Sequence, residues 1–204
     1  MIKNVIFDVG NVFVRWSPPD VVERCFGIPK NSDENLQRAE ALLRGPLWRR
    51  LNMGELTQAE AALAYQAEFG LSKQQAEELF FHVTDHQEPI QGTEALARRL
   101  KRSGYRVFAL TDNVHEIVAY LKARHQFWPL FDDAVVSAEI GLMKPDPAIF
   151  RHAIERFGLV AAETMFLDDI DANVDGAQSV GMAALLFTTA ERGEVDLREL
   201  GLTF

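Results

Sequence analysis

Short runs of consecutive apolar residues recur along the chain, and each run ends in small or polar residues. The first run is Val5-Ile6-Phe7, which leads directly into Asp8-Val9-Gly10. Similar runs cover residues 105–110, 134–136, 164–167 and 183–187. Strands that are buried on both faces show continuous apolar runs rather than alternation. The pattern therefore predicts five short strands of a parallel sheet.

Helical periodicity marks several of the segments between these runs. Apolar residues at helical spacing predict helices at 93–102 and 114–124, and Asp146-Pro147 has the form of a helix N-cap followed by proline at the first helical position. Because strands and helices alternate, the chain is expected to form an α/β fold, an open parallel five-stranded sheet with right-handed crossovers.

Residues 15–87 interrupt this alternation, since they contain helical patterns and no strand-like run. Amphipathic segments predict helices at 34–43, 58–69 and 72–82. Pro18-Pro19 and Gly45-Pro46 are interpreted as breaks between them. We expect an α/β core of residues 1–14 and 88–204, with residues 15–87 inserted after the first strand as a helical cap. The chain is expected to return to the core near Glu88-Pro89.

Composition narrows the function classes. The 204 residues suit one domain with a modest insertion. With 30 acidic and 21 basic residues the net charge is -9, and no basic cluster extends beyond residues 98–102, which disfavours a nucleic-acid partner. No apolar stretch is long enough to cross a membrane, and Asp8 interrupts the first run too early for a signal peptide. The single cysteine, Cys25, excludes an intrachain disulfide, so a cytoplasmic protein without a membrane partner is expected.

Polar residues that carry chemistry come after the predicted strands. They are Asp8 and Gly10 after the first strand, Thr111, Asp112 and Asn113 after the second, and Asp168 and Asp169 after the fourth. Ligands of open parallel sheets bind beyond the carboxyl ends of the strands. Carboxylates gathered there repel one another, and oxygen ligands favour Mg²⁺ as the ion that relieves this cost. Lys144 and a hydroxyl beside such a site would form a pocket for an anion, with phosphate the natural candidate.

Four motifs in this order resemble those of the haloacid dehalogenase superfamily. They are residues 7–12 (Phe-Asp-Val-Gly-Asn-Val), Leu110-Thr111-Asp112, Lys144-Pro145, and residues 166–169 (Phe-Leu-Asp-Asp) followed by Asn173, Gly176 and Ala177. The resemblance covers nearly the whole chain, includes a helical cap, and is nearest to the branch that contains a glucose-1-phosphate phosphatase and the phosphatase domain of soluble epoxide hydrolase. Each motif alone has little specificity, but all four in order are a strong signal.

The resemblance implies a phosphatase of a small phosphorylated metabolite, with a sugar phosphate as the first candidate. Asp8 would be the nucleophile and would form an aspartyl phosphate that water hydrolyses. The implied ligands of Mg²⁺ are Asp8, the backbone carbonyl of Gly10, Asp169 and, directly or through water, Asp168. The implied phosphate-binding groups are the Thr111 hydroxyl, the Asp112 backbone N–H and Lys144, which would also neutralise Asp8.

Two positions depart from the family pattern. Phosphatase members usually carry a second aspartate two residues after the nucleophile, where it acts as general acid and base, and this chain has Gly10 there. The nearest branch shares this glycine. That branch usually has asparagine where this chain has Asp112, so we formulate the hypothesis that Asp112 partly replaces the missing proton donor. A substrate with a good leaving group is the second explanation.

Three other functions are compatible with parts of the pattern. A 2-haloacid dehalogenase would use Asp8 to attack carbon without metal, although Asp168 and Asp169 would then stand uncompensated beside a carboxylate substrate. A phosphomutase would return the phosphoryl group from Asp8, but it needs the acid that Gly10 replaces. A catalytically silent binding protein would keep only the fold.

A few residues outside the motifs have two interpretations. Trp16, Trp48, Arg15 and Arg49 fit either packing or substrate contact. His82 and His86 have the spacing of zinc ligands, but no residue completes a ligand set, which favours a helix end near the return crossing.

Overall fold

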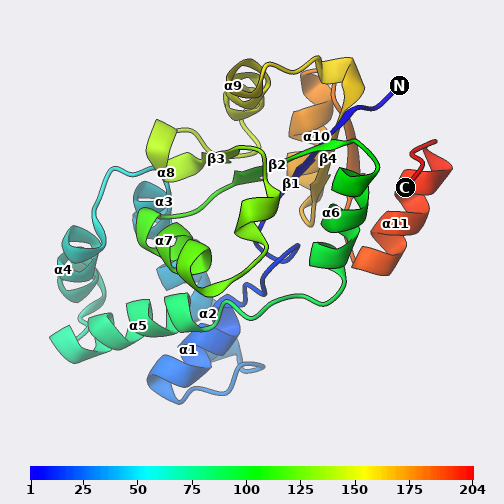
Figure 1. Ribbon diagram of the computed structural model, residues 1–204. Coiled ribbons are helices and arrows are strands. Elements are labelled where there is room, and N and C mark those ends of the chain that lie inside the picture. Colours follow the sequence, from blue (N-terminus) through cyan, green and yellow to red (C-terminus); the bar gives the residue numbers. More distant parts are fainter.

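A five-stranded parallel sheet forms the centre of the computed structural model, which describes residues 1–204 (Figure 1). The strands are β1 (Asn4–Phe7), β2 (Arg106–Thr111), β3 (Ala134–Val136), β4 (Thr164–Asp168) and β5 (Ala183–Leu186). Their order in the sheet is β3-β2-β1-β4-β5, and every neighbouring pair is parallel. The structure confirms the predicted fold class, and each predicted strand is present to within about one residue.

The register of the three central strands determines which residues reach the edge of the sheet together. Phe7 of β1 pairs with Ala109 of β2 and with Leu167 of β4. The next residues along these strands are therefore level with one another at the carboxyl edge. They are Asp8, Leu110 and Asp168.

Alternate residues of the buried strands face two separate hydrophobic cores. Val5 and Phe7 of β1 belong to the larger core, which also contains the apolar sides of α6 (Thr93–Arg102), α7 (His115–Arg124) and α11 (Ala190–Glu199). Ile6 belongs to the smaller core, where α9 (Pro147–Phe157) and α10 (Asp171–Ser179) pack. Burial on both faces explains why the strands read as continuous apolar runs.

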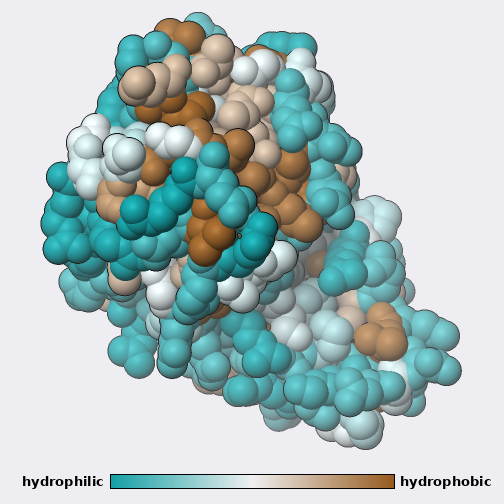
Figure 2. All heavy atoms as spheres, turned by 90° about the vertical axis from the view of Figure 1, so that its right-hand side faces the viewer, coloured by the Kyte–Doolittle hydropathy of each residue, from teal (hydrophilic) through white to brown (hydrophobic).

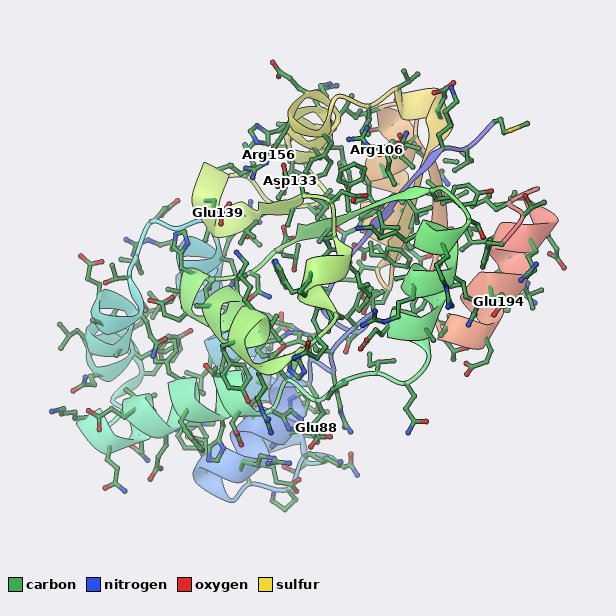
Figure 3. All side chains as sticks on the ribbon, viewed as in Figure 1. Glu88, Arg106, Asp133, Glu139, Arg156 and Glu194 are labelled. Atoms are coloured by element: carbon green, nitrogen blue, oxygen red, sulfur yellow. The ribbon has the colours of Figure 1, made fainter.

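Shorter elements complete the connections of the core. They are α8 (Ser137–Ile140) and the two 3₁₀ turns η1 (Trp128–Leu130) and η2 (Ala161–Glu163). Arg156 of α9 donates to both carboxylate oxygens of Asp133, at 3.0 and 3.1 Å, just before β3 (Figure 3). Such a bidentate pair adds geometric specificity to the contact between α9 and the residue before β3.

Five helices occupy the segment between β1 and α6. They are α1 (Pro18–Phe26), α2 (Asp33–Leu43), α3 (Pro46–Asn52), α4 (Gln58–Phe69) and α5 (Lys73–Asp85). The sequence predicted α2, α4 and α5. Gly45-Pro46 does separate two helices, α2 and α3, whereas Pro18-Pro19 lies in the first turn of α1, which was not predicted as a helix. Proline at the first position of a helix has a suitable φ angle and lacks only an N–H that would have no helical partner there. The prolines therefore begin α1 and α3.

Two crossings of the chain lie side by side where this helical segment joins the sheet. The backbone N–H of Arg15 donates to the carbonyl of Glu88 at 2.8 Å, and Val14 forms a β-bridge with Pro89. Glu88 is labelled in Figure 3. The return crossing was predicted at this place. The connection ties the start and the end of the helical segment together, next to the carboxyl end of β1.

The face of the molecule seen in Figure 2 is mostly hydrophilic, and the chain has some exposed apolar residues. Figure 2 looks onto the side on which α11 lies, and hydrophobic side chains gather in the upper part of this view. Val195 and Leu200, at 44% and 54% exposure, are among the exposed apolar residues of the chain. No helix of the structure is both long enough and apolar enough to cross a membrane.

Candidate active site

Lys144 joins three strand ends at the carboxyl edge of the sheet. Its Nζ lies 2.8 Å from Asp8 Oδ1, 2.7 Å from Asp168 Oδ2 and 3.3 Å from the carbonyl oxygen of Leu110. These three partners are the residues that the strand register brings to one level. The ammonium group has three N–H donors, and each of them has an acceptor. These contacts hold the Lys144 ammonium group in a fixed position beside the Asp8 carboxylate.

The Asp168 carboxylate is completely buried and accepts hydrogen bonds at both oxygens. Oδ2 receives Lys144, while Oδ1 accepts from the backbone N–H of Ile170 and the side chain of Asn173, each at 2.9 Å. With its oxygens occupied in this way, Asp168 orients Lys144 and the first turn of α10. The next carboxylate, Asp169, is free of these contacts and faces Asp8.

Asn11 connects the loop after β1 to Asp169. Its side-chain Nδ2 donates to Asp169 Oδ2 at 3.1 Å, and its Oδ1 accepts from the backbone N–H of Trp16 at 2.9 Å. Asn11 has a φ of 51°, in the left-handed region, which asparagine tolerates better than most residues. This residue therefore shapes the loop and orients a predicted metal ligand, a role that the sequence motif did not reveal.

The end of β2 contributes Asp112 and Asn113 to the site, but not the side chain of Thr111. Asp112 Oδ1 accepts from the backbone N–H of Lys144 at 3.1 Å, which ties the lysine loop to β2. Thr111 is 1% exposed and does not line the cavity, because β2 carries it inside the sheet opposite Val136. The role of the Thr111 hydroxyl in phosphate binding stays a prediction.

Burial and mutual repulsion perturb the titration of these groups. Burial raises the pKa of Asp8 to about 8, and the neighbouring Asp168 and Asp169 add to the increase while Lys144 opposes it. Burial is also the largest cause that raises the pKa of Asp112 and of Asp169. Burial alone would lower the pKa of Lys144, but attraction by Asp8, Asp168 and Asp112 outweighs it and raises this pKa. Lys144 is therefore positively charged.

Four carboxylates and one ammonium group lie at this edge, so a further positive charge would reduce the repulsion among the carboxylates. Asp8, Asp168 and Asp169 each offer an oxygen, and these three oxygens lie within 4.8 Å of one another. An all-oxygen donor set at such spacing fits a small hard cation such as Mg²⁺. Gly10, the other predicted ligand, lines the same cavity, and its backbone carbonyl oxygen is of a type that coordinates such ions. The residues present thus fit a divalent ion.

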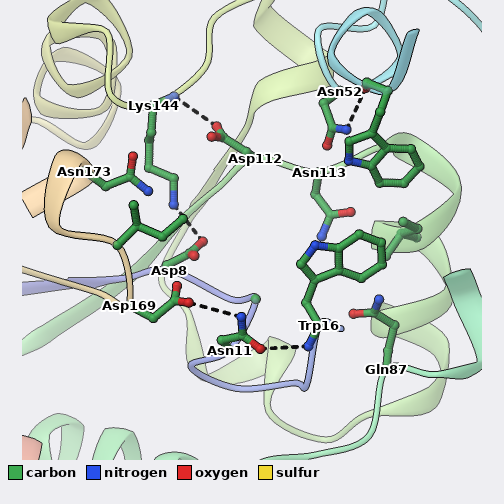
Figure 4. Close-up of a pocket in the computed structure, with 14 residues that line it drawn as sticks. Asp8, Asn11, Trp16, Asn52, Gln87, Asp112, Asn113, Lys144, Asp169 and Asn173 are labelled. Carbon is green, nitrogen blue, oxygen red and sulfur yellow. Dashed lines mark hydrogen bonds and ion pairs between the residues drawn. The ribbon is translucent and has the colours of Figure 1, made fainter. Parts of the chain in front are cut away.

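A cavity of about 160 Å³ opens over these groups (Figure 4). Its charged residues are Asp8, Asp112, Lys144 and Asp169. Its other lining residues are Gly10, Asn11, Trp16, Trp48, Asn52, Gln87, Asn113, Ile117, Ile170 and Asn173. Most of the predicted site residues are therefore brought together in one cavity.

The helical segment supplies part of this lining. Trp48 and Asn52 come from α3, while Trp16 and Gln87 lie at its two connections to the core. The sequence allowed either packing or substrate contact for Trp16 and Trp48, and in the structure both line the cavity. Arg15 and Arg49 do not, and Arg15 instead pairs with Asp20. Asn52 and Gln87 carry no motif, so only the tertiary structure identifies them.

His86 occupies the end of α5 rather than a cluster of metal ligands. It is the residue after the last turn of the helix, is 4% exposed, and lies 3.4 Å from Asp20. The group of acidic residues that could hold a metal consists of Asp8, Asp168 and Asp169.

The fold and this edge of the sheet are those of a hydrolase of the haloacid dehalogenase type. Residues 2–181 match the family described as haloacid dehalogenase-like hydrolase. Because this match covers most of the chain, the protein belongs to the haloacid dehalogenase-like hydrolase family.

Individual relatives agree with this assignment. The sesquiterpene phosphatase astK of Aspergillus oryzae is 28% identical over 198 residues, which are 97% of this chain and 96% of astK. The glyceraldehyde 3-phosphate phosphatase of Methanocaldococcus jannaschii is 32% identical over 95 residues, which are 46% of this chain and 42% of that enzyme.

The fold also matches a solved structure that holds the expected ion. The haloacid dehalogenase family enzyme bt-2542 of Bacteroides thetaiotaomicron, in complex with magnesium and inorganic phosphate, superimposes with a TM-score of 0.74. The two chains are 22% identical, and the superposition covers 91% of this chain and 93% of the other. This similarity concerns the fold.

Proposed function

We propose that the protein is a magnesium-dependent phosphatase that hydrolyses a small phosphorylated metabolite through an aspartyl phosphate on Asp8. The observation that carries this proposal is the contact of one buried lysine with Asp8 and Asp168, with Asp169 beside them. The phosphatase names of the two sequence relatives support the reaction class. The magnesium and phosphate bound by the structural relative support the ion and the transferred group.

In the first half of the reaction an oxygen of Asp8 attacks the phosphorus atom of the substrate. A bond forms between the carboxylate and phosphorus, and the bond from phosphorus to the leaving oxygen breaks with its electron pair on that oxygen. In the second half, water attacks the aspartyl phosphate and restores the Asp8 carboxylate while inorganic phosphate leaves. Lys144 holds Asp8 in position and offsets negative charge on the phosphoryl oxygens.

Asp8, Asp169, the carbonyl of Gly10 and, directly or through water, Asp168 would hold Mg²⁺. When bound, the ion supplies positive charge that neutralises the carboxylates and the phosphate and orients the phosphoryl group. Asn11 keeps Asp169 directed toward this place through its hydrogen bond. The proposed contacts for phosphate are Lys144, the backbone N–H of Asp112 and the Thr111 hydroxyl.

The leaving oxygen needs a proton when its alcohol is a poor leaving group. Gly10 has no side chain to provide it, whereas Asp112 lines the same cavity and its Oδ1 accepts a hydrogen bond from the Lys144 backbone. The second oxygen of Asp112 is available to a substrate. We therefore retain Asp112 as the proposed proton donor, because burial raises its pKa and favours the protonated acid.

Residues 15–87 would act as a cap over this chemistry. The support is that Trp16, Trp48, Asn52 and Gln87 of this segment line the cavity whose opposite wall is Asp8 and Lys144. A cap of this kind limits the access of bulk water to the reacting groups and contacts the leaving group.

The test measures phosphate release from p-nitrophenyl phosphate and acetyl phosphate with Mg²⁺, for the wild type and for Asp8→Asn. We expect turnover in the wild type, loss of turnover in EDTA, recovery on adding Mg²⁺ back, and background rates in Asp8→Asn. Asparagine keeps the size of the side chain and removes the nucleophile, so circular dichroism of this variant serves as the folding control.

The rival functions predict different results in the same assays. Release of halide from a 2-haloacid at full rate in EDTA would identify a dehalogenase and overturn the proposal. Phosphoryl return to the substrate without net phosphate release would identify a mutase. Equal background rates in the wild type and Asp8→Asn would identify a silent binding protein.

A further inference from the structure

Ser137 is a buried hydroxyl residue that neither the motifs nor the proposed reaction uses. It is the first residue of α8 and comes directly after Val136, which pairs with Thr111 in the sheet. The residue is 0% exposed, so its hydroxyl does not reach a substrate and acts only through the groups that it bonds. These groups belong to two different parts of the molecule.

The first part is the loop after β2, which consists of Asp112 and Asn113. The Ser137 hydroxyl oxygen accepts a hydrogen bond from the backbone N–H of Asn113 at 2.9 Å. One residue earlier, the Asp112 side chain accepts from the backbone N–H of Lys144 at 3.1 Å. The loop is therefore tied at two consecutive residues, and the Asp112 N–H, a proposed contact for phosphate, belongs to the first of them.

The second part is the end of α3 in the helical segment. The Ser137 hydroxyl lies 2.6 Å from the backbone carbonyl oxygen of Asn52 and 3.2 Å from that of Asn113. A hydroxyl has only one proton to donate, and the shorter contact takes it. Figure 4 shows Asn52 on α3 above Asn113. A single hydroxyl thus joins α3 to the loop after β2.

Gly54 allows α3 to come this close to α8. A Cβ at Gly54 would lie 2.2 Å from the carbonyl oxygen of Ala138, the residue after Ser137. The φ of Gly54 is 70°, which also favours glycine. The chain that leaves α3 therefore packs directly on the backbone of α8, and this packing brings the Asn52 carbonyl to the Ser137 hydroxyl.

We infer that Ser137 is a positioning residue for phosphate binding, whose hydroxyl keeps the loop after β2 in its binding geometry while α3 packs on α8. The inference rests on the proposed phosphatase function. If α3 moves away, the hydroxyl proton has a second acceptor in the Asn113 carbonyl, so the hydrogen bonds of the loop change with the position of α3. Because coupling between two equilibria is reciprocal, phosphate should in turn hold α3 on α8.

A purely structural role of Ser137 predicts a different result. Loss of a buried hydroxyl leaves the Asn52 carbonyl and the Asn113 N–H without a partner, which destabilises the fold whatever the function of the residue. A positioning role predicts in addition that the folded variant binds phosphate more weakly. Thermal stability and the inhibition constant of phosphate, measured on the same variants, separate the two roles.

The first experiment compares Ser137→Ala with Thr164→Val. Thr164 is also 0% exposed and its hydroxyl donates to the Val160 carbonyl at 2.9 Å, but it lies at the amino end of β4, opposite the site. Both variants should unfold at a lower temperature than the wild type. With p-nitrophenyl phosphate as substrate and Mg²⁺ present, we expect the inhibition constant of inorganic phosphate to rise about fivefold or more in Ser137→Ala. It should stay unchanged in Thr164→Val, and Ser137→Thr, which keeps the hydroxyl, should restore it toward the wild-type value.

The outcomes of this experiment separate the inference from the proposed function. An unchanged inhibition constant in a folded Ser137→Ala variant would overturn the positioning role and leave the phosphatase in place. Absence of turnover in the wild type would reject the proposed function and the positioning role with it.

The second experiment disturbs the packing of α3 and leaves Ser137 in place, which covers the case in which Ser137→Ala does not fold. Gly54→Ala and Gly70→Ala both place a Cβ at a positive φ, of 70° and 65°, so their backbone strain is alike. Only at Gly54 does this Cβ meet the Ala138 carbonyl, since nothing lies within 4 Å at Gly70. We expect the inhibition constant of phosphate to rise about fivefold or more in Gly54→Ala and to stay unchanged in Gly70→Ala. Equal constants in these two variants would contradict the inference.

Hydrogen exchange tests the reciprocal effect. In the wild type, saturating phosphate with Mg²⁺ should slow the exchange of backbone amides in α3 and leave α11 unchanged. In Ser137→Ala this protection of α3 should be smaller, also at saturating phosphate, because the hydroxyl that transmits it is missing. Equal protection of α3 in the wild type and in Ser137→Ala would refute a coupling through Ser137.

Discussion

Removal of the Lys144 charge is the most direct test of whether this ammonium group offsets the buried carboxylates of Asp8 and Asp168. The side chain is 1% exposed, and its ammonium group lies 2.8 Å from Asp8 and 2.7 Å from Asp168. At an effective dielectric constant of about 20, each contact contributes an attraction of about 6 kcal/mol, against which the burial of each ion costs several kcal/mol. Removing one member of a buried pair leaves its partners uncompensated and typically costs about 3–5 kcal/mol. We expect Lys144→Met to lower the free energy of unfolding by about this amount.

Urea unfolding monitored by circular dichroism in EDTA at pH 9, above the pKa of Asp8, measures this loss. Lys73→Met is the matched control, because Lys73 is 81% exposed and its pair with Glu77 spans 3.7 Å, which predicts a change below about 0.5 kcal/mol. Mg²⁺ should restore part of the stability of Lys144→Met by supplying the missing charge, and an ion at 100 times its Kd contributes about 2.7 kcal/mol.

A second background separates charge from packing. In Asp8→Asn one of the two carboxylates beside Lys144 is neutral, so Lys144→Met should cost at least about 1 kcal/mol less than in the wild type. If Lys144→Met alone does not fold, the double variant should be the more stable of the two. An equal cost in both backgrounds, or a loss below about 1 kcal/mol in the wild type, would refute the charge argument.

Four further measurements probe the same site and its surroundings. Because burial raises the pKa of Asp8 to about 8, above its value near 3.9 in an unfolded chain, the folded state keeps a proton that the unfolded state has released. Stability in EDTA should therefore fall between pH 6 and pH 8, and urea midpoints that stay level or rise would contradict this. Asp112→Asn should reduce kcat most for substrates with poor leaving groups and alter the pH profile of turnover, whereas full turnover with an unchanged profile would end its role as proton donor. A Cβ at Gly10 would lie 3.9 Å from the Cβ of Trp16, an ordinary contact, so Gly10→Asp should fold and raise kcat for poor leaving groups by up to about 10²-fold. Burial raises the pKa of the Cys25 thiol to about 11, so its reaction with a disulfide reagent at pH 8 should be slow in the folded protein and fast in urea.

The sheet and the position of its ligand edge were predictable from local patterns. Strands such as β1 and β4 are buried on both faces and therefore show continuous apolar runs, and the residues after them are confined to one edge because parallel strands all end there. That geometry is general, so Asp8 and Asp168 could be assigned to one place without coordinates.

The helical segment was predictable only in part, for a local reason. Pro18 and Pro46 are compatible with either a turn or the first position of a helix, and the choice depends on the next few residues of the chain and on packing. Apolar residues of α1 and α3 enter the main core, and this tertiary burial stabilises both short helices.

The sequence by itself determined which residue types meet at the edge of the sheet, since the apolar runs and the polar residues that follow them are local patterns. Only the tertiary structure decided how they meet. The register sets Asp8 level with Asp168, so that the Lys144 ammonium group reaches both. The folding of α3 against β2 through Ser137 likewise brings Asn52 beside Asn113 from distant parts of the chain. Such contacts depend on distances across the fold, which no local pattern of residues records.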